Sequence, residues 1–256
     1  MRLAHDVTGD GPPTVLLHAF PLSRRMWSRE CLQWGRFVRV ITPDLPGFGE
    51  SPRQGTPSIP AMASAVFALL DQLDIHEPVI AAGLSMGGYV VFEMVRQAPE
   101  RVRALGLFAT RATGDTAEQR QGRLMLAERI REEGMQPLVE TMGSMLLGRT
   151  AQASRPDLSK IIMTDIQAND PEGVADALVA MARRADHTDL LPSLARPTLI
   201  VAGEEDAVIP MAQTADMHRR IPGARLEVLP HAGHLVHLEQ PALLDGVVER
   251  FVRNLP

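Results

Sequence analysis

Residues 83–88 read Gly83-Leu84-Ser85-Met86-Gly87-Gly88, and this short stretch decides how the chain folds. An apolar run, Val79 to Leu84, leads into the serine, and a helical pattern, Tyr89 to Arg96, follows the glycines. A serine on a tight turn from a strand to a helix points its hydroxyl out of the sheet, and small neighbours let the backbone crowd together. The helix start adds N–H donors where negative charge develops. The stretch therefore predicts Ser85 as a nucleophile on an α/β scaffold.

Short apolar runs that end in turn residues recur along the chain and are followed by helical patterns. Strands that alternate with helices indicate a mainly parallel sheet covered on both faces. The alternation stops between residues 111 and 190, where four helical segments follow one another. We therefore expect a doubly wound α/β core from residues 1–110 and 191–256, with residues 111–190 inserted as a helical cap. The predicted strands are Thr14–His18, Val38–Thr42, Val79–Leu84, Arg103–Ala109, Thr198–Gly203 and Arg225–Leu229.

Helix-start signals occur at four points within the expected cap. Asp115 stands three residues before Glu118, and Asp170 stands directly before Pro171. Pro137 and Pro156 occupy first-turn positions. Such residues are typical of helix N-termini, so helices are predicted to begin at each of these points.

The bulk composition excludes several kinds of partner. The 256 residues are 45% hydrophobic and 22% charged, and 26 basic against 31 acidic residues leave a formal net charge of -5. No basic excess could follow a phosphate backbone, so no nucleic-acid partner is expected. The uncharged apolar stretch from Pro78 to Phe92 is broken by glycines and is too short for a membrane span. Residues 1–11 lack the apolar block of a secretory signal, so the cytoplasm is the expected location. The sequence does not decide between a monomer and a homo-oligomer.

Cys31 is the only cysteine, which rules out an internal disulfide. We expect it to be a buried structural thiol, as free cysteines often are. The chain contains no Cys/His cluster with zinc spacing, and no dinucleotide fingerprint follows the first strand. No metal and no organic cofactor is predicted.

A serine hydroxyl needs a base to remove its proton, and eight histidines compete for that role. His234 is the strongest candidate because the loop His231-Ala232-Gly233-His234 directly follows the last predicted strand, on the same side of the sheet as Ser85. His231 and His237 are the near alternatives.

The base in turn needs an acid that fixes its tautomer and stabilises its cation. Asp206 follows the predicted strand Thr198–Gly203, and the order serine, aspartate, histidine is the one that this architecture uses. Glu204 and Glu205 are alternatives in the same loop.

Taken together, these motifs resemble the α/β-hydrolase superfamily over nearly the whole chain, nearest to 3-oxoadipate enol-lactonase-like enzymes and related bacterial carboxylesterases. The resemblance implies that the backbone N–H groups of Phe20 and Met86 form an oxyanion hole. The usual second residue of the oxyanion loop is glycine, whereas here it is Ala19, which a left-handed backbone would strain. The segments that carry the resemblance, besides residues 83–88, are His18–Pro21, Asp44–Gly49, Gly203–Pro210 and His231–Pro241.

The expected function is hydrolysis of a small carboxylic ester or lactone through an acyl-enzyme on Ser85. Haloalkane dehalogenases and epoxide hydrolases share the layout but need aspartate at this position, which excludes them. A cofactor-free perhydrolase of the haloperoxidase type would use the same three residues and remains an alternative. So does a non-catalytic small-ligand receptor on the same scaffold, because a fold does not dictate function.

The expected cap must cover Ser85 without aromatic residues, because no Phe, Tyr or Trp occurs from Ala109 through Arg250. Met142 and Met145 are therefore candidate lining residues, and flexible methionines favour a pocket that accepts several short acyl groups. Trp27 is the expected aromatic partner from the sheet side. Arg111 could hold a substrate carboxylate, or it could pair with Asp115 as a structural hinge.

Overall fold

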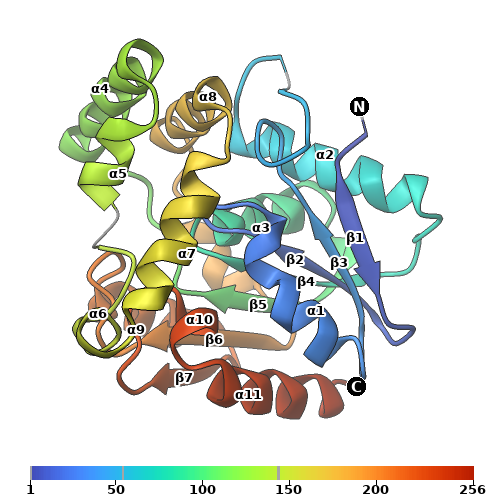
Figure 1. Cartoon of the computed structure of the whole chain (residues 1–256). Helices are drawn as coiled ribbons and strands as arrows, with labels where there is room; N and C mark the ends of the chain where they lie inside the picture. The colour runs from blue at the N-terminus through green and yellow to red at the C-terminus, as the bar shows by residue number, and fades with distance from the viewer. Residues whose placement is uncertain (1, 54, 143–144) are drawn as a thin grey trace.

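Figure 1 shows the computed structural model of the chain, which describes residues 2–53, 55–142 and 145–256. Within these residues one sheet has the strand order β1-β3-β2-β4-β5-β6-β7. The edge strand β1 is antiparallel to β3, and the other pairs are parallel. The strands are β1 (His5–Thr8), β2 (Pro13–Leu17), β3 (Arg39–Pro43), β4 (Val79–Leu84), β5 (Val102–Phe108), β6 (Thr198–Gly203) and β7 (Arg225–Leu229).

The centre of the sheet is buried on both faces. Every residue of β2, β4 and β6 is buried, which explains why these strands are continuous apolar runs instead of alternating ones. β4 pairs with β2 on one side and with β5 on the other, so it lies in the middle of the sheet. Its carboxyl end is therefore surrounded by the ends of its neighbours, where ligands bind in open α/β sheets.

Helices cover the sheet on both faces and confirm the doubly wound class. α2 packs on α3 behind the sheet, and α1 packs on α11 in front of it (Figure 1). The α-helices of this core are α1 (Ser28–Trp34), α2 (Ile59–Gln72), α3 (Met86–Gln97), α9 (Met211–Arg220), α10 (Val236–Glu239) and α11 (Pro241–Arg253), with short 3-10 turns at Arg24–Trp27, Pro99–Arg101 and Thr188–Ser193.

Between β5 and β6 the described chain forms five helices, not the four expected. The additional one is the short helix α6, which follows Gly148 and has no side-chain cap, so the sequence carried no helix-start signal for it. In Figure 1 the five lie together at one side of the sheet, and α4 packs along α8. They are α4 (Ala117–Glu133), α5 (Gln136–Met142), α6 (Arg149–Ser154), α7 (Pro156–Gln167) and α8 (Pro171–Ala182).

The start of α4 differs from the prediction. Thr116, not Asp115, caps the helix, because the Thr116 hydroxyl accepts the Gln119 N–H while the Gln119 side chain accepts the Thr116 N–H. Asp115 is thereby left free to bind arginines. The other starts are as predicted: Pro156 opens α7, and Asp170 caps α8 by accepting the N–H groups of Glu172 and Gly173.

The strand β1 was missed in the sequence because it is short and mostly polar, and its pairing with β3 rather than its own apolar content keeps it in the sheet. β4, β6 and β7 have the predicted bounds, and the remaining strands differ from theirs by one residue at each end. No helix in the described ranges is both long and apolar enough to cross a membrane.

Candidate active site

Ser85 stands on a strained turn between β4 and α3. Its backbone has φ 53 and ψ -112, a conformation that costs free energy for a residue with a side chain. Hydrogen bonds hold it there: the Ser85 N–H donates to Phe108 O at 2.9 Å, and the Ser85 carbonyl accepts from Gly88 N at 2.9 Å and from Thr110 Oγ1 at 2.8 Å, with a longer contact to Tyr89 N at 3.4 Å. The surrounding structure therefore imposes the geometry that presents the Ser85 hydroxyl.

The glycines of the turn are required by close backbone approach. A Cβ on Gly83 would collide with the backbone of Gly87, and a Cβ on Gly87 would collide with the carbonyl of Leu17 at the end of β2. The turn can therefore pack directly against the loop that follows β2.

His234 and Asp206 form a buried hydrogen-bonded pair. His234 Nδ1 lies 2.9 Å from Asp206 Oδ2, and both side chains are almost inaccessible to solvent. The other carboxylate oxygen, Oδ1, accepts the N–H groups of Val208 at 2.8 Å and Ile209 at 3.0 Å. A carboxylate held in this way accepts the Nδ1 proton of a neutral imidazole and leaves Nε2 as the free acceptor. Among the described residues, no hydrogen bond joins His234 to the Ser85 hydroxyl.

The alternative histidines lie in environments that do not suit a base. The His231 side chain is two-thirds exposed and lies 3.9 Å from Glu205. His237 is buried against the ring of Trp27 at 4.8 Å, and neither of its ring nitrogens has a hydrogen-bond partner within the described chain. Burial lowers the pKa of His237 to about 3.

The alternative acids are occupied elsewhere. Glu204 accepts the N–H of His231 at 3.2 Å. Glu205 accepts the N–H of Thr150 at 2.8 Å and its hydroxyl at 2.7 Å, which ties the loop carrying Asp206 to the start of α6. Neither glutamate makes a described contact to His234.

The loop after β2 carries Phe20, and its backbone is unstrained at Ala19. Ala19 is not among the described residues with positive φ, so its Cβ causes no left-handed strain. His18 braces the loop, because its Nδ1 donates to Ala19 O at 3.0 Å while its Nε2 accepts the N–H of Leu45 at 2.9 Å. Burial lowers the pKa of His18, in keeping with the neutral ring that these two contacts need. Met86 is the first residue of α3, where N–H groups have no partner within the helix.

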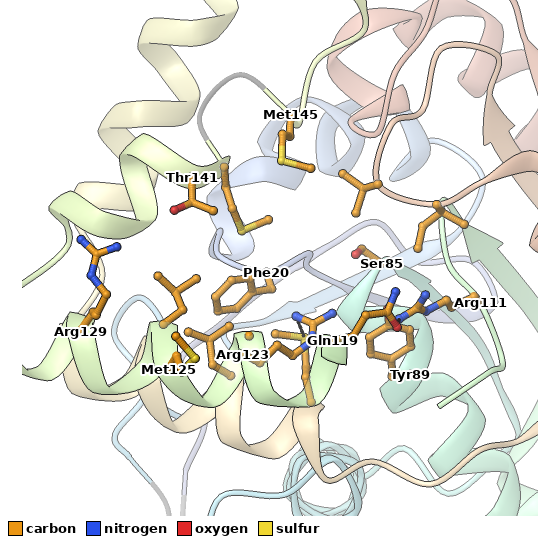
Figure 2. A pocket seen from close by; sticks show the side chains of 17 residues that line it. Phe20, Ser85, Tyr89, Arg111, Gln119, Arg123, Met125, Arg129, Thr141 and Met145 are labelled. Atoms are coloured by element: carbon orange, nitrogen blue, oxygen red, sulfur yellow. Dashed lines mark hydrogen bonds between the residues drawn. The ribbon is translucent and has the colours of Figure 1, made fainter. Parts of the chain in front are cut away.

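A cavity of about 550 Å³ opens beside Ser85. Figure 2 shows Phe20 on one side of Ser85 and Arg111 on the other, with residues of α4 opposite. Most of the wall comes from the segment between β5 and β6. The full lining is Phe20, Ser85, Tyr89, Arg111, Gln119, Gly122, Arg123, Met125, Leu126, Arg129, Thr141, Met142, Met145, Leu178, Met181, Val208 and Ile209.

Three of the four expected pocket residues line this cavity, and Trp27 does not. Met142, Met145 and Arg111 are part of the wall. Trp27 is fully buried instead, in contact with the rings of Trp34 and Phe108. It ends the 3-10 turn Arg24–Trp27, which directs the indole into the core rather than toward the cavity.

Arg111 forms an ion pair with Asp115, which the sequence allowed as the structural alternative to binding a substrate carboxylate. Its Nη2 lies 2.7 Å from Asp115 Oδ1 and 3.1 Å from Gln119 Oε1. Burial acts to raise the pKa of Asp115, but Arg123 and Arg184 outweigh it and hold that pKa below its usual value. Asp115 therefore stays ionised.

Several lining residues were not singled out in the sequence. Tyr89 lies one turn of α3 after Ser85, and Arg123 lies one turn of α4 after Gln119, so helical spacing from Ser85 and Asp115 could have identified both. Val208 and Ile209 follow Asp206 in the same loop. No set of three or more His, Cys, Asp or Glu side chains in the described ranges is arranged to hold a metal ion. Cys31 is buried, and burial raises the pKa of its thiol.

Comparison with known proteins places the chain in a family. Residues 12–241 match the alpha/beta hydrolase fold family. The solved thermophilic esterase from Thermogutta terrifontis, a malate-bound structure, is 39% identical with a TM-score of 0.96, over 98% of this chain and 93% of that one. The solved enol-lactonase from Burkholderia xenovorans LB400 is 25% identical with a TM-score of 0.90, over 98% and 96%.

A curated relative points the same way. The 3-oxoadipate enol-lactonase 2 of Acinetobacter baylyi is 27% identical over 246 residues, which cover 96% of this chain and 90% of that protein. The family match covers most of the chain, and the relatives include an esterase and enol-lactonases. The chain therefore belongs to the α/β-hydrolase family, and its relatives support hydrolase activity.

Proposed function

We propose that this protein hydrolyses a small carboxylic ester or lactone through an acyl-enzyme on Ser85, with His234 as the base and Asp206 as its partner. The observation that carries the proposal is the buried 2.9 Å contact between His234 and Asp206. It lies at the carboxyl ends of the strands, where the strained turn after β4 also presents Ser85 to a cavity. The names of the esterase and enol-lactonase relatives support the same reaction class.

In the first half of the proposed reaction, Ser85 Oγ attacks the acyl carbon while its proton passes to His234 Nε2. The carbonyl oxygen becomes negative, and the N–H groups of Phe20 and Met86 are the proposed donors to it. The bond to the leaving oxygen then breaks, and that oxygen takes the proton from His234. A lactone keeps its leaving group attached, since both ends belong to one molecule.

In the second half, water replaces the alcohol. His234 removes a proton from the water, the resulting hydroxyl adds to the acyl carbon, and Ser85 leaves with the proton returned by His234. Asp206 holds the imidazole in the correct tautomer throughout. The Ser85 to His234 hydrogen bond must form in the substrate complex, as such bonds often tighten only there.

We also propose that residues 111–190 act as a cap. They provide most of the cavity wall, and Glu239 and Glu205 fasten their α6 end to the loops of His234 and Asp206. Glu239 Oε2 accepts the N–H groups of Gly148 at 2.8 Å and Gly233 at 2.9 Å, and Glu205 binds Thr150. The cap is therefore connected directly to the loops that carry the chemistry.

The experiment is turnover of p-nitrophenyl butyrate, combined with mass spectrometry after exposure to a p-nitrophenyl phosphonate. The wild-type protein should hydrolyse the ester and gain one phosphonyl group on the peptide that contains Ser85. Ser85→Ala should lose both, and turnover should fall by roughly four orders of magnitude or more. Labelling of another residue, or turnover that survives Ser85→Ala, would refute the acyl-enzyme. Absence of turnover and of labelling in the wild type would support a receptor.

Hydrogen peroxide separates the proposal from a perhydrolase. With ester and peroxide together, a hydrolase should release mainly the carboxylic acid, because water reaches the acyl-enzyme in large excess. Release of peracid as the main product would favour the perhydrolase instead.

A further inference from the structure

The cavity beside Ser85 has an excess of positive charge. Its described lining includes Arg111, Arg123 and Arg129 and no aspartate or glutamate. Arg129 is paired with Glu133 at 3.1 Å on the outer part of α4, and about half of each side chain is exposed. The unbalanced charge is therefore carried by Arg111 and Arg123.

One carboxylate serves three arginines next to this wall. The buried Asp115 lies 2.7 Å from Arg111 Nη2, 2.8 Å from Arg123 Nε and 2.8 Å from Arg184 Nη1. Three positive charges against one negative charge leave an excess of two. Such an excess attracts anions strongly where bulk water and salt cannot screen it.

Arg184 is satisfied by the protein itself. Its guanidinium donates to Met181 O and to Thr113 O, each at 2.9 Å, and lies 4.2 Å from the centre of the Tyr89 ring. It is not among the lining residues. Arg184 therefore supports the cluster from behind and does not take part in the wall.

Arg111 and Arg123, in contrast, keep unused donors. Arg111 Nε is buried without a hydrogen-bond partner, and Nη1 makes none within the described residues, although the side chain is only 6% exposed. Arg123 Nη1 contacts only the Met181 sulfur at 3.7 Å, and a thioether is a weak acceptor. An unmet donor on the buried Arg111 is costly, and Arg123, whose side chain is 25% exposed, keeps donors free for a ligand in the cavity that it lines.

We propose that Arg111 and Arg123 form an anion subsite for a carboxylate on the substrate of Ser85. This inference rests on the proposed function and names the substrate class for the same cavity. Figure 2 shows Arg111 and Arg123 on either side of Gln119, in the wall near Ser85. A planar guanidinium matches a carboxylate in a two-pronged contact, and the methionine and leucine side chains of the wall suit the carbon chain between carboxylate and ester.

The test compares two methyl esters with the same six-carbon acyl chain, monomethyl adipate and methyl hexanoate, which differ in a terminal carboxylate. Methanol release gives kcat/KM for each. The wild type should prefer monomethyl adipate, and Arg123→Gln should lower the ratio of the two values by about tenfold or more, as the loss of a charge-assisted hydrogen bond implies. Arg123→Lys keeps the positive charge but loses the planar pair of donors, so it should give an intermediate ratio of the two kcat/KM values.

Arg129→Gln is the matched control, because Arg129 lines the same cavity from the same helix but is already paired with Glu133. Its ratio should stay within about twofold of the wild type. An unchanged ratio in Arg123→Gln, or an equal fall in Arg129→Gln, would overturn the subsite. Thermal unfolding of each variant checks that the fold persists.

Binding to Ser85→Ala separates the subsite from the reaction. Calorimetry should detect monomethyl adipate binding to Ser85→Ala, with much weaker binding to the double variant that also carries Arg123→Gln. If that dependence is found while the wild type hydrolyses neither ester, the subsite stands and the proposed function fails. If methyl hexanoate is hydrolysed but monomethyl adipate is neither bound nor hydrolysed, the subsite fails and the proposed function stands.

Discussion

The turn that presents Ser85 and the helix α4 lie on opposite sides of one cavity, but they are held in different ways (Figure 2). All of β4 is buried, and so is α3 from Met86 through Val95. In the 17 residues of α4, only Ala127 and Ile130 are buried. The turn is fixed by backbone packing, whereas α4 is fixed by Asp115 and its arginines and by contact with α8.

This difference separates two tasks. A group that reacts must be held to within a fraction of an ångström, and close backbone packing supplies that precision. A wall that selects a substrate can be changed one side chain at a time if few of its residues support the core. We therefore expect substitutions around Ser85 and its partners to be severe, and substitutions along α4 to be mild.

After Ser85→Ala, the largest effect is expected from Asp206→Asn, in the loop after β6. The amide oxygen would stay with the N–H groups of Val208 and Ile209, so the amide NH2 group would face Nδ1 as a donor. His234 would then take the wrong tautomer and lose its free acceptor toward Ser85. Turnover of p-nitrophenyl butyrate should fall by roughly 10³-fold to 10⁴-fold with little change in thermal stability.

Glu204→Gln is its control, because Glu204 lies two residues away and binds only the His231 N–H in the described structure. Near-normal turnover in Asp206→Asn, with a large loss in Glu204→Gln or Glu205→Gln, would show that the acid has been misassigned.

Gly87→Ala should be the most damaging small change to stability. Its Cβ would meet the carbonyl of Leu17 and also lie 3.0 Å from the carbonyl of His18, so the turn at Ser85 and the loop after β2 would have to separate. We expect a loss of about 2–3 kcal/mol in the free energy of unfolding, measured with urea. Turnover should fall as well, because that loop carries Phe20, a proposed oxyanion donor. Unchanged stability would mean that the packing around Ser85 is looser than the structure indicates.

The carboxyl group of Glu30, which is buried in the core, should make the free energy of unfolding depend on pH. Burial raises the pKa of Glu30 from an ordinary value of 4.5 to about 7, against the opposing hydrogen bond from Arg29. Between these values the folded chain binds more protons than the unfolded chain, so stability falls as pH rises and the loss is complete above about pH 7. The total loss is on the order of 3 kcal/mol.

Glu30→Gln should therefore be more stable than the wild type at pH 8, while the difference largely disappears at pH 4.5. Urea unfolding at both values measures it. Glu133→Gln, on the exposed side of α4, is the control and should show no such gain at high pH, since Glu133 is paired with Arg129 at the surface. A gain of equal size at both pH values would contradict a buried carboxyl with a raised pKa.

The sequence predicted the packed core better than the wall of the cavity. β4, β6 and β7 were found with their bounds because buried parallel strands are continuous apolar runs, and Ser85 follows one of them. Trp27 was misplaced because the direction of one side chain depends on the 3-10 turn that carries it. The contact of Arg184 with Asp115 joins residues far apart in the chain, and no local pattern encodes it.

Gly122→Ala should give the smallest effect, and it has the opposite sign to Gly87→Ala. Gly122 lies inside α4, and a Cβ there would meet nothing within 4 Å. Alanine is a better helix former because the unfolded chain loses less conformational freedom, so the free energy of unfolding should rise by about 0.5–1 kcal/mol. The measurement is urea unfolding alongside Gly87→Ala. Because Gly122 lines the cavity, its new methyl group would reduce the space for the acyl chain, so turnover of p-nitrophenyl butyrate should change more than that of p-nitrophenyl acetate. A destabilised Gly122→Ala would show that α4 is as tightly constrained as the turn at Ser85, and the contrast between the two sides of the cavity would not hold.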